Sequence, residues 1–435
     1  MLGAKLDQHD RRLDALVASV AALVFLVACG GVDELPTTPA GTPAPLATCQ
    51  ATTDRLTPPP QQSKASKILV AESVASYALA YTPSRHVFET DDGSLYIFFF
   101  DGDHVIARVA DPNGKLGPSS LVSHVPVAQV FSAVMVGERF YVAYTDRNQM
   151  NLYLRSIRWL DETTVLDEPL TLRSDVRSFS LQGPSLGVAP DSGLWVIYRD
   201  NPGPEKLIVF AIRALGGDER SWGEPEQIST GAHVADSFYG TSGAVFWPGG
   251  EPLIVHSGES ALNAAVLTDG RWNHAVIDDE YTGVHDFAGV VDAQGVLHLV
   301  YMVGCSDLEE VLATFKFDGC EARWIRYDAD SRWSDAVSIG PAAIHSLSIG
   351  IVGGIPVVFA YDGKEALWYA PVTTIERVEI AHFVEKEILY TWTAVPAESD
   401  GIVAAWVEGE RPPWLKGQDV RHSVYLKKME HVAAR

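Results

Sequence analysis

Short runs of alternating apolar and polar residues recur along the chain from about residue 67 to the C-terminus. Seven of these runs follow a turn that contains glycine, and they are rich in aromatic and β-branched residues: DDGSLYIFFFD, VGERFYVAYTD, DSGLWVIYRD, PGGEPLIVHSG, AQGVLHLVYMV, VGGIPVVFAYD and SDGIVAAWVE. Alternation with a period of two predicts β-strands with one buried face. The turn glycines recur every ~50 residues, which predicts a repeat architecture of the propeller type.

Each repeat contains further predicted strands around this glycine-led strand. A short strand rich in small residues comes before the turn, for example GPSLGVA or TSGAVF. Small side chains suit an innermost strand, where the backbones of neighbouring sheets converge. A third strand follows, such as KLIVFAIRA, and then a short fourth strand. Each repeat therefore predicts one four-stranded antiparallel sheet.

A tryptophan introduces the fourth strand in three repeats. Trp222, Trp272 and Trp333 follow an acidic, turn-forming stretch, and Leu116 takes the same place in the first repeat. A large ring at this point can cover the apolar gap between adjacent sheets, because an aromatic side chain buries about 150–250 Å². We expect these residues to be structural, with stacking on a sugar as the alternative for any that is exposed.

The last repeat has only three strands before the chain ends. The segment Ser66 to Ser73, SKILVAES, precedes the first repeat and has the character of the missing outer strand. Pairing it beside RHSVYLKK would close the ring and remove an exposed sheet edge. The sequence thus predicts an all-β, seven-bladed β-propeller over residues 67–435, closed by an N-terminal clasp strand. Six or eight blades are the alternatives if one repeat is miscounted.

The N-terminal 66 residues have a different character. Basic residues precede an apolar run, Ala15 to Ala28, that is too short to span a bilayer and has the length of a signal-peptide core. The run ends in LVACGG, which resembles a bacterial lipobox. That resemblance implies a lipoprotein signal peptide over residues 1–28 and a lipid chain such as palmitate on Cys29. An ordinary secretory signal is the alternative.

Residues 29–66 are rich in proline and threonine and show no apolar periodicity, which is typical of a tether. Gly30 and Gly31 follow Cys29, and the absence of aspartate there implies export to the outer membrane. The expected location is the bacterial cell envelope, with the propeller held to the membrane through its lipid anchor.

Three further cysteines agree with export. Cys305 and Cys320 flank a segment that resembles one arm of a hairpin, so we expect a disulfide between them in an oxidising compartment. A metal site is the alternative, but the sequence contains neither CxxC nor HExxH. Cys49 has no obvious partner in the tether.

Composition narrows the possible partners. The 435 residues are 47% hydrophobic and 20% charged, with a formal net charge of −23 that is spread along the chain. Nucleic acid is excluded as an expected partner, because phosphate binding needs a clustered basic surface. No nucleophile elbow, phosphate loop or dedicated calcium loop occurs, so no cofactor or metal is assigned. We expect a monomer unless the protein is part of an envelope assembly.

The repeats resemble the sialidase-like, BNR or Asp-box type β-propeller superfamily. The box is matched by TDGRW, with Asp269, Gly270 and Trp272, and in part by DADSRW, with Asp330 and Trp333. In that superfamily the boxes stabilise turns and carry no chemistry. A sialidase would need three arginines on a carboxylate, a tyrosine nucleophile paired with glutamate, and an aspartate acid/base.

Only Arg85 stands where an arginine of the superfamily would begin the first blade. The Ile-Pro that should follow it is replaced by His86 and Val87. No other arginine and no Tyr/Glu pair can be assigned from the sequence. No catalytic residue is therefore predicted, and the sequence favours binding over catalysis.

Propeller ligands usually approach the face at which the inner strands begin. The side chains expected there are the candidate binding residues: Arg85, His86, Asp236, Tyr239, His285, Asp286, His345 and Trp392. Carboxylates in this group could bind a cation or a sugar hydroxyl.

Three functions follow from these expectations. The favoured one is a membrane-anchored, exported lipoprotein whose propeller is a non-catalytic binding module for a protein partner or a glycan. The first alternative is a glycan-active enzyme, a sialidase-like hydrolase or a lyase, with its site in the central funnel. The second is a scaffold subunit of an envelope assembly, with contacts from the insertions around DNPGPEKL and between Cys305 and Cys320.

Overall fold

The computed structural model describes most of the chain after residue 66. The described residues are 67–73, 78–79, 85–160, 163–174, 181–203, 206–216, 218–229, 243–257, 261–280, 287–304, 320–328, 330, 332–343, 346–362, 366–382, 393–409 and 422–429. The predicted signal peptide, Cys29 and the tether lie outside them. The chain divides into Met1–Gln61 and Gln62–Arg435, and the fold below belongs to the second unit.

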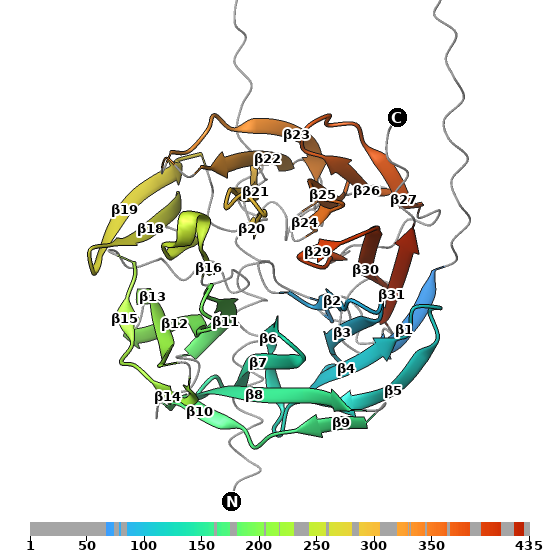
Figure 1. Ribbon diagram of the computed structural model, residues 1–435, viewed down its shortest axis with the longest axis horizontal. Helices are drawn as coiled ribbons and strands as arrows, with labels where there is room; N and C mark the ends of the chain where they lie inside the picture. The colour runs from blue at the N-terminus through green and yellow to red at the C-terminus, as the bar shows by residue number, and fades with distance from the viewer. Residues whose placement is uncertain are drawn as a thin grey trace, which may run out of the picture. The chain divides into compact units, whose positions relative to one another are not determined.

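Seven antiparallel sheets form a ring, with each sheet as one blade of a propeller (Figure 1). In each blade three strands are hydrogen-bonded in chain order from the axis outward; β9 and β10 both pair with β8, β14 and β15 both pair with β13, and β1 pairs with β31. Blade 1 contains β2 Val87–Glu89, β3 Leu95–Phe100, β4 Val105–Ala110 and β5 Leu116–Leu121, and blade 2 contains β6 Val127–Val136, β7 Arg139–Asp146, β8 Asn151–Leu160, β9 Thr163–Leu166 and β10 Leu170–Ser174. Blade 3 contains β11 Leu181–Val188, β12 Leu194–Gly203, β13 Lys206–Leu215, β14 Asp218–Trp222 and β15 Glu226–Gln227. Blade 4 contains β16 Ala244–Phe246, β17 Leu253–Ser257, β18 Leu262–Thr268 and β19 Arg271–Asp278.

The remaining strands make blades 5 to 7. Blade 5 contains β20 Phe287–Val291, β21 Leu297–Val303, β22 Cys320–Tyr327 and β23 Val337–Ala342. Blade 6 contains β24 Ser348–Val352, β25 Ile355–Tyr361, β26 Ala366–Pro371 and β27 Val378–His382, and β29 Glu398–Ser399 pairs parallel to β24. Blade 7 contains β28 Thr393–Ala394, β30 Ile402–Gly409, β31 His422–Met429 and β1 Ile68–Ser73. The one helical element among the described residues is a short 3-10 turn, η2 Pro248–Gly250. None of their helices is long and apolar enough to cross a membrane.

The predicted clasp is confirmed. Strand β1 pairs antiparallel with β31, from Ile68↔Leu426 to Ser73↔His422, and so supplies the outer strand of blade 7. Lys67, just before β1, forms a 2.7 Å ion pair with Glu408 of β30 and lies 4.0 Å from the ring centre of Tyr425 in β31. The first and last parts of the fold are thereby joined, and the ring has seven blades as predicted.

The core is divided among the gaps between blades. Seven clusters of buried apolar side chains each combine residues of two neighbouring blades. Between blades 1 and 2, for example, the rings of Phe98 and Phe140 lie 5.4 Å apart, and Trp159 meets Phe140 edge-on. Neighbouring blades therefore stabilise one another by burying apolar surface.

The three tryptophans of the outer strands take the predicted structural positions. Trp222, Trp272 and Trp333 are partly buried, and each packs against a cluster between two blades. The acidic turns also behave as expected: in the blade 5 turn, Asp328 accepts hydrogen bonds from the backbone of Asp330 and Arg332. Both features hold the outer strands in place.

Small residues in the innermost strands are required by close packing. A Cβ atom added to Gly289 of β20 would lie 2.6 Å from the ring of Phe246, and one on Gly350 of β24 would lie 2.5 Å from the carbonyl oxygen of Pro396. Neither distance is compatible with van der Waals contact. The glycines thus allow the innermost strands to approach each other.

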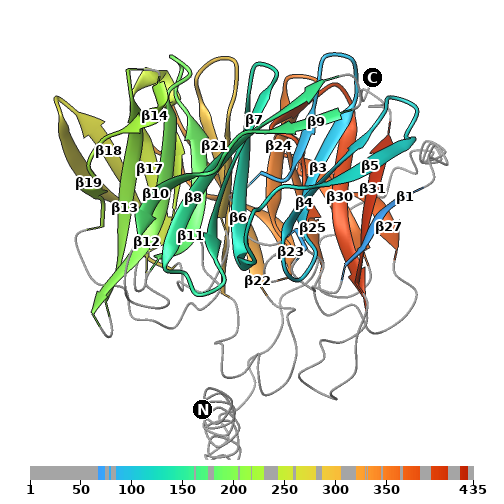
Figure 2. The ribbon, with the colours of Figure 1, turned by 90° about the horizontal axis from the view of Figure 1, so that it is seen from below.

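All blades run between the same two faces of the ring (Figure 2). We call the face at which the innermost strands begin the start face. Because the pairing is antiparallel, the second strand of each blade ends at the start face, the third begins there and the outermost ends there. Residues far apart in sequence are therefore collected at the start face.

Candidate binding face

Arg85 lies two residues before β2 at the start face, and its side chain extends across the ring. Its Nη1 donates to the carbonyl oxygens of Ile349 at 2.7 Å and Val395 at 3.5 Å, and its Nη2 donates to that of Gly289 at 2.7 Å. These acceptors belong to the inner parts of blades 6, 7 and 5. One side chain of blade 1 thus contacts the neighbouring blade 7 and, farther round the ring, blades 5 and 6.

Burial changes the acid–base property of Arg85. Desolvation of the guanidinium lowers its pKa from 12.5 to about 10. The group is still protonated at neutral pH, and its guanidinium donates to main-chain carbonyls. Arg85 therefore joins the blades near the axis through hydrogen bonds from a charged guanidinium.

His86, the next candidate, lies in the core between blades 1 and 2. It is only 1% exposed, and its ring meets that of Phe131 edge-on at 4.6 Å. Its carbonyl accepts a hydrogen bond from the backbone of Phe98. His86 and Arg85 are adjacent in sequence, but the His86 ring is not open to solvent.

The other six candidates lie outside the described residues: Asp236, Tyr239, His285, Asp286, His345 and Trp392. Their segments join the outermost strand of one blade to the innermost strand of the next. The flanking described strand ends, such as the end of β19 and the beginning of β20, are at the start face. That these six side chains form a binding site stays a prediction.

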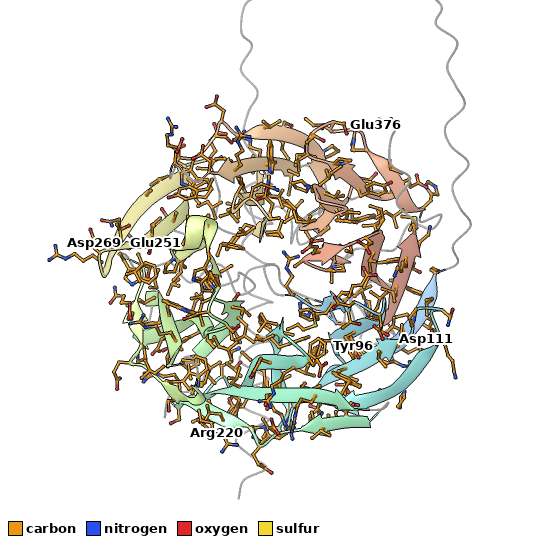
Figure 3. The ribbon with its side chains drawn as sticks, viewed as in Figure 1. Tyr96, Asp111, Arg220, Glu251, Asp269 and Glu376 are labelled. Atoms are coloured by element: carbon orange, nitrogen blue, oxygen red, sulfur yellow. The ribbon has the colours of Figure 1, made fainter. Side chains whose placement is uncertain are left out.

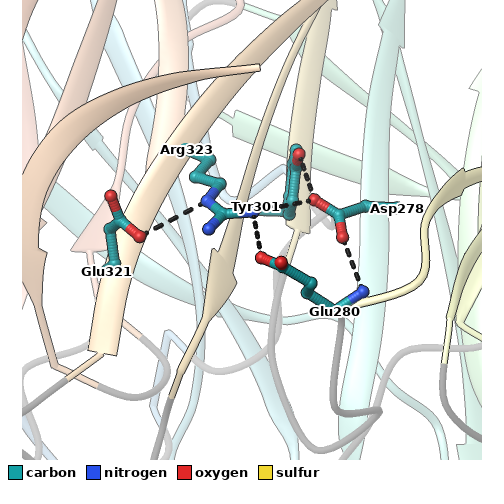
Figure 4. Close-up of polar contacts among 5 residues, drawn as sticks. All are labelled: Asp278, Glu280, Tyr301, Glu321 and Arg323. Carbon is teal, nitrogen blue, oxygen red and sulfur yellow. Dashed lines mark hydrogen bonds and ion pairs between the residues drawn. The ribbon is translucent and has the colours of Figure 1, made fainter. Parts of the chain in front are cut away.

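The structure reveals a polar cluster that the sequence did not indicate, between blades 4 and 5 (Figure 4). The hydroxyl of Tyr301 in β21 donates to Asp278 at the end of β19, with an O···O distance of 2.7 Å. Arg323 in β22 forms ion pairs with Asp278 at 3.3 Å, Glu280 at 2.7 Å and Glu321 at 3.3 Å. All five residues lie near strand ends at the start face.

The electrostatics of this cluster are those of a stabilising network. Burial and the hydrogen bond to Asp278 raise the pKa of Tyr301 far above 10, so its phenol stays neutral. Burial alone would lower the pKa of Arg323, but its carboxylate partners outweigh that effect, and the net shift is upward. The cluster therefore joins the two blades with fixed charges.

The cluster does not reproduce a sialidase site. It pairs a tyrosine with an acid, which the sequence could not assign, but Tyr301 is fully buried. A phenol with no exposed surface and a raised pKa cannot attack a sugar in this conformation. Within the described part of the chain, no group of three or more His, Cys, Asp or Glu residues is suited to hold a metal ion.

Cys320 begins β22 and is buried, whereas Cys305 lies outside the described residues. The disulfide between them stays a prediction.

Figure 3 shows that the labelled charged residues Asp111, Arg220, Asp269 and Glu376 lie at the outer rim of the ring. Some of the charged side chains of the propeller therefore lie on its outer rim, away from the axis.

No protein-family model and no curated protein matches this sequence. Solved structures do match over most of the chain. The polysaccharide lyase Uly1 is 12% identical with a TM-score of 0.44, over 81% of this chain and 91% of that one. An oligogalacturonate lyase in complex with manganese is 12% identical with a TM-score of 0.47, over 85% of this chain and 99% of that one.

A lectin from Aleuria aurantia in complex with Fucalpha1-6GlcNAc is 11% identical with a TM-score of 0.43, over 69% of this chain and 95% of that one. Identities and scores at this level carry no argument about ligand or chemistry. The fold rests on the strand pairing of the chain itself: a seven-bladed β-propeller, closed by its own N-terminal strand.

Proposed function

We propose that this protein is an exported, lipid-anchored lipoprotein of the bacterial cell envelope whose propeller is a non-catalytic binding module. Its ligand is a protein partner or a glycan, bound at the start face. We further propose that the propeller is related to the sialidase-like superfamily. Support for that relationship comes from the turn at Asp269 and Gly270, both of positive φ, which is followed by the packed Trp272.

The hydrogen bonds of Arg85 favour a binding function over catalysis. A sialidase-type reaction requires an arginine that is available to a substrate carboxylate. The guanidinium of Arg85 instead donates to the main-chain carbonyls of three blades, two of them at 2.7 Å. A substrate would have to break these contacts before it could use the group.

The proposed anchor is supported by the sequence around Cys29 and by the proline-rich segment before the propeller. Two or more acyl chains give a stable membrane anchor, at about 0.8 kcal/mol per buried methylene. Because Gly30 and Gly31 follow Cys29, the proposed location is the outer membrane. The expected state is a monomer unless the protein joins an envelope assembly.

The function is tested with the mature, folded chain on a glycan array and in pull-downs from bacterial envelope membranes. We expect stoichiometric recovery of one protein, or binding to one class of glycan, without change to the glycan. Release of a free sugar, or of an unsaturated product, from an array glycan would replace this proposal with the glycan-active enzyme. Absence of binding in both assays would contradict a binding module.

The anchor is tested separately by growth with labelled palmitate. We expect label on the wild-type protein and none on the Cys29→Ser variant. An unlabelled wild type that is released after signal cleavage would support the secretory alternative. Peptide mapping of the same exported protein without reductant tests the predicted Cys305–Cys320 disulfide.

A further inference from the structure

Strand β19, the outermost strand of blade 4, has an unusually regular outer edge. It spans Arg271–Asp278 and pairs with β18 through six consecutive pairs, from Asn263↔Val276 to Thr268↔Arg271. The single register shift lies at the far end, between Leu262 and Asn263. The strand therefore presents a long, regularly paired edge at the rim of the ring (Figure 1).

The described outermost strands of the other blades are interrupted. Register shifts break the pairing of β5, β10, β14, β23, β27 and β1, and the longest unbroken stretch elsewhere is the four pairs between β8 and the short β9. Pro118 and Pro341 lie within β5 and β23. Bulges, prolines and short strands are the means by which proteins prevent pairing at sheet edges.

Over its six consecutive pairs, from Arg271 to Val276, β19 lacks these protections. Its sequence, RWNHAVID, contains neither proline nor lysine. Arg271, Asn273, His274, Ala275 and Val276 are exposed, and Val276, at 60%, is the most exposed of the large apolar residues described. Its central residues from Trp272 to Ile277 carry no fixed charge, so nothing at the middle of the edge repels another strand.

The backbone of β19 is equipped to bind an extended chain. In an antiparallel sheet, every second residue of an edge strand directs its N–H and C=O away from the neighbouring strand. An added strand would satisfy these groups and gain specificity from the alternating side chains, a mode of peptide recognition known as β-augmentation. We propose that β19 is a docking edge for an extended segment of a partner protein.

The charges around β19 specify the partner. Asp278 is followed by the exposed Asp279 and Glu280, and the chain as a whole has a formal net charge of −23. The complementary segment is uncharged and β-branched where it lies against Trp272 to Ile277, and it has lysine or arginine beside Asp279. A second copy of the chain would bring the same formal net charge of −23, and self-association is tested separately below. This surface is on the side of the propeller, and its use does not depend on a ligand at the start face.

The test uses a fluorescein-labelled peptide with a Thr-Val-Thr-Val-Thr-Val centre and two lysines at each end, measured by fluorescence anisotropy with the full chain. We expect saturable binding. A peptide with glutamates in place of the lysines should bind at least tenfold more weakly, and so should one with proline in the centre. Equal binding of all three peptides, or no binding of the first, would refute the proposal.

Two variants locate the site. His274→Pro removes a backbone donor in the middle of β19, and Val276→Lys places a positive charge against the basic peptide; each should weaken binding at least tenfold. The matched control is Ser338→Lys, at an exposed position of β23, which should bind as the wild type does. Circular dichroism identifies a variant that fails to fold. If one variant does not fold, peptide binding by the other variant tests the proposal.

Sedimentation separates the remaining possibility. If the wild type self-associates and Val276→Lys abolishes this, the occupant is a second copy, and the assignment to a partner protein is wrong. If the peptide fails to bind while the glycan array or pull-down succeeds, the docking edge is refuted and the proposed function stands. The two failures are thereby distinguishable.

Discussion

The Nη2 atom of Arg85 lies 2.7 Å from the carbonyl oxygen of Gly289, although the two residues are 204 positions apart in sequence. One belongs to the start of blade 1 and the other to the innermost strand of blade 5. With its contacts to Ile349 and Val395, the guanidinium fastens the ring across its axis. This relationship explains why a charged residue is partly buried at the centre of a propeller.

Replacing Arg85 with methionine is expected to destabilise the fold. The change keeps much of the side-chain volume but leaves the carbonyls without their donor, and an unsatisfied buried polar group costs about 1–3 kcal/mol. We expect the free energy of unfolding, measured with urea, to fall by about 2 kcal/mol. Arg85→Lys should recover part of the loss. An Arg85→Met protein more stable than the wild type would show that the group is held for a ligand at the expense of stability.

Removing the clasp strand should destabilise the whole propeller, whereas removing the tether should not. A chain that begins at Lys67 keeps β1, but a chain that begins at residue 74 loses the pairing with β31 and the buried Val70. Burying a valine side chain contributes about 1.5–3 kcal/mol, and an exposed edge would also be created. Thermal unfolding should show a melting temperature lower by at least several degrees for the shorter chain only. Equal melting temperatures would mean that closure does not stabilise the ring.

Gly289→Ala should be destabilising because there is no room for a methyl group. The added Cβ would lie 2.6 Å from the ring of Phe246 in the neighbouring innermost strand. Overpacking of this kind costs about 1–3 kcal/mol. Gly223→Ala is the matched control, since the nearest atom to its Cβ would be at 3.5 Å. Chemical denaturation of both variants compares them, and an equally stable Gly289→Ala would show that the innermost strands can separate without loss.

The bond between Tyr301 and Asp278 should couple blades 4 and 5. Tyr301→Phe removes the donor at 2.7 Å from the carboxylate, and a hydrogen bond to a charged group contributes about 1.5–3 kcal/mol. A double-mutant cycle with Asp278→Asn measures the coupling free energy, which we expect to exceed 0.5 kcal/mol. Additive effects of the two changes would indicate that the contact contributes no stability of its own.

Stability should fall at alkaline pH because buried tyrosines must ionise on unfolding. Burial raises the pKa of Tyr198 from 10.0 to about 12, and the pKa values of Tyr144 and Tyr301 are also raised. Since the folded protein holds these protons more tightly, the contribution of Tyr198 is complete below pH 10. It is lost as the pH rises to about 12, by on the order of 2 kcal/mol.

The urea midpoint measured from pH 9 to pH 12 checks this effect. It should decline as the pH rises, and it should decline less steeply for Tyr198→Phe. Parallel curves for the wild type and the variant would assign the alkaline loss to other groups. The direction of the effect is opposite to that of Arg85, whose lowered pKa makes its charged form unfavourable and lets stability rise above pH 10.

Local patterns in the sequence were sufficient to predict the repeat, a ring of seven blades and its closure by the N-terminal strand. These features depend on local patterns: strands alternate with a period of two, turn residues separate them, and SKILVAES supplied the one strand that the last repeat lacked. The tryptophans could also be placed, because their position before each outer strand puts them at the gap between blades.

The contacts between polar groups, in contrast, could not be predicted from the sequence. Nothing near Tyr301 in the sequence indicates Asp278 or Arg323, and nothing near Arg85 indicates the carbonyl of Ile349, 264 positions away. The regular edge of β19 was equally hidden, since register shifts depend on how strands pair and leave no simple mark in composition. Local sequence sets the strand period, whereas ring closure brings distant strand ends together and so sets the contacts of buried charges.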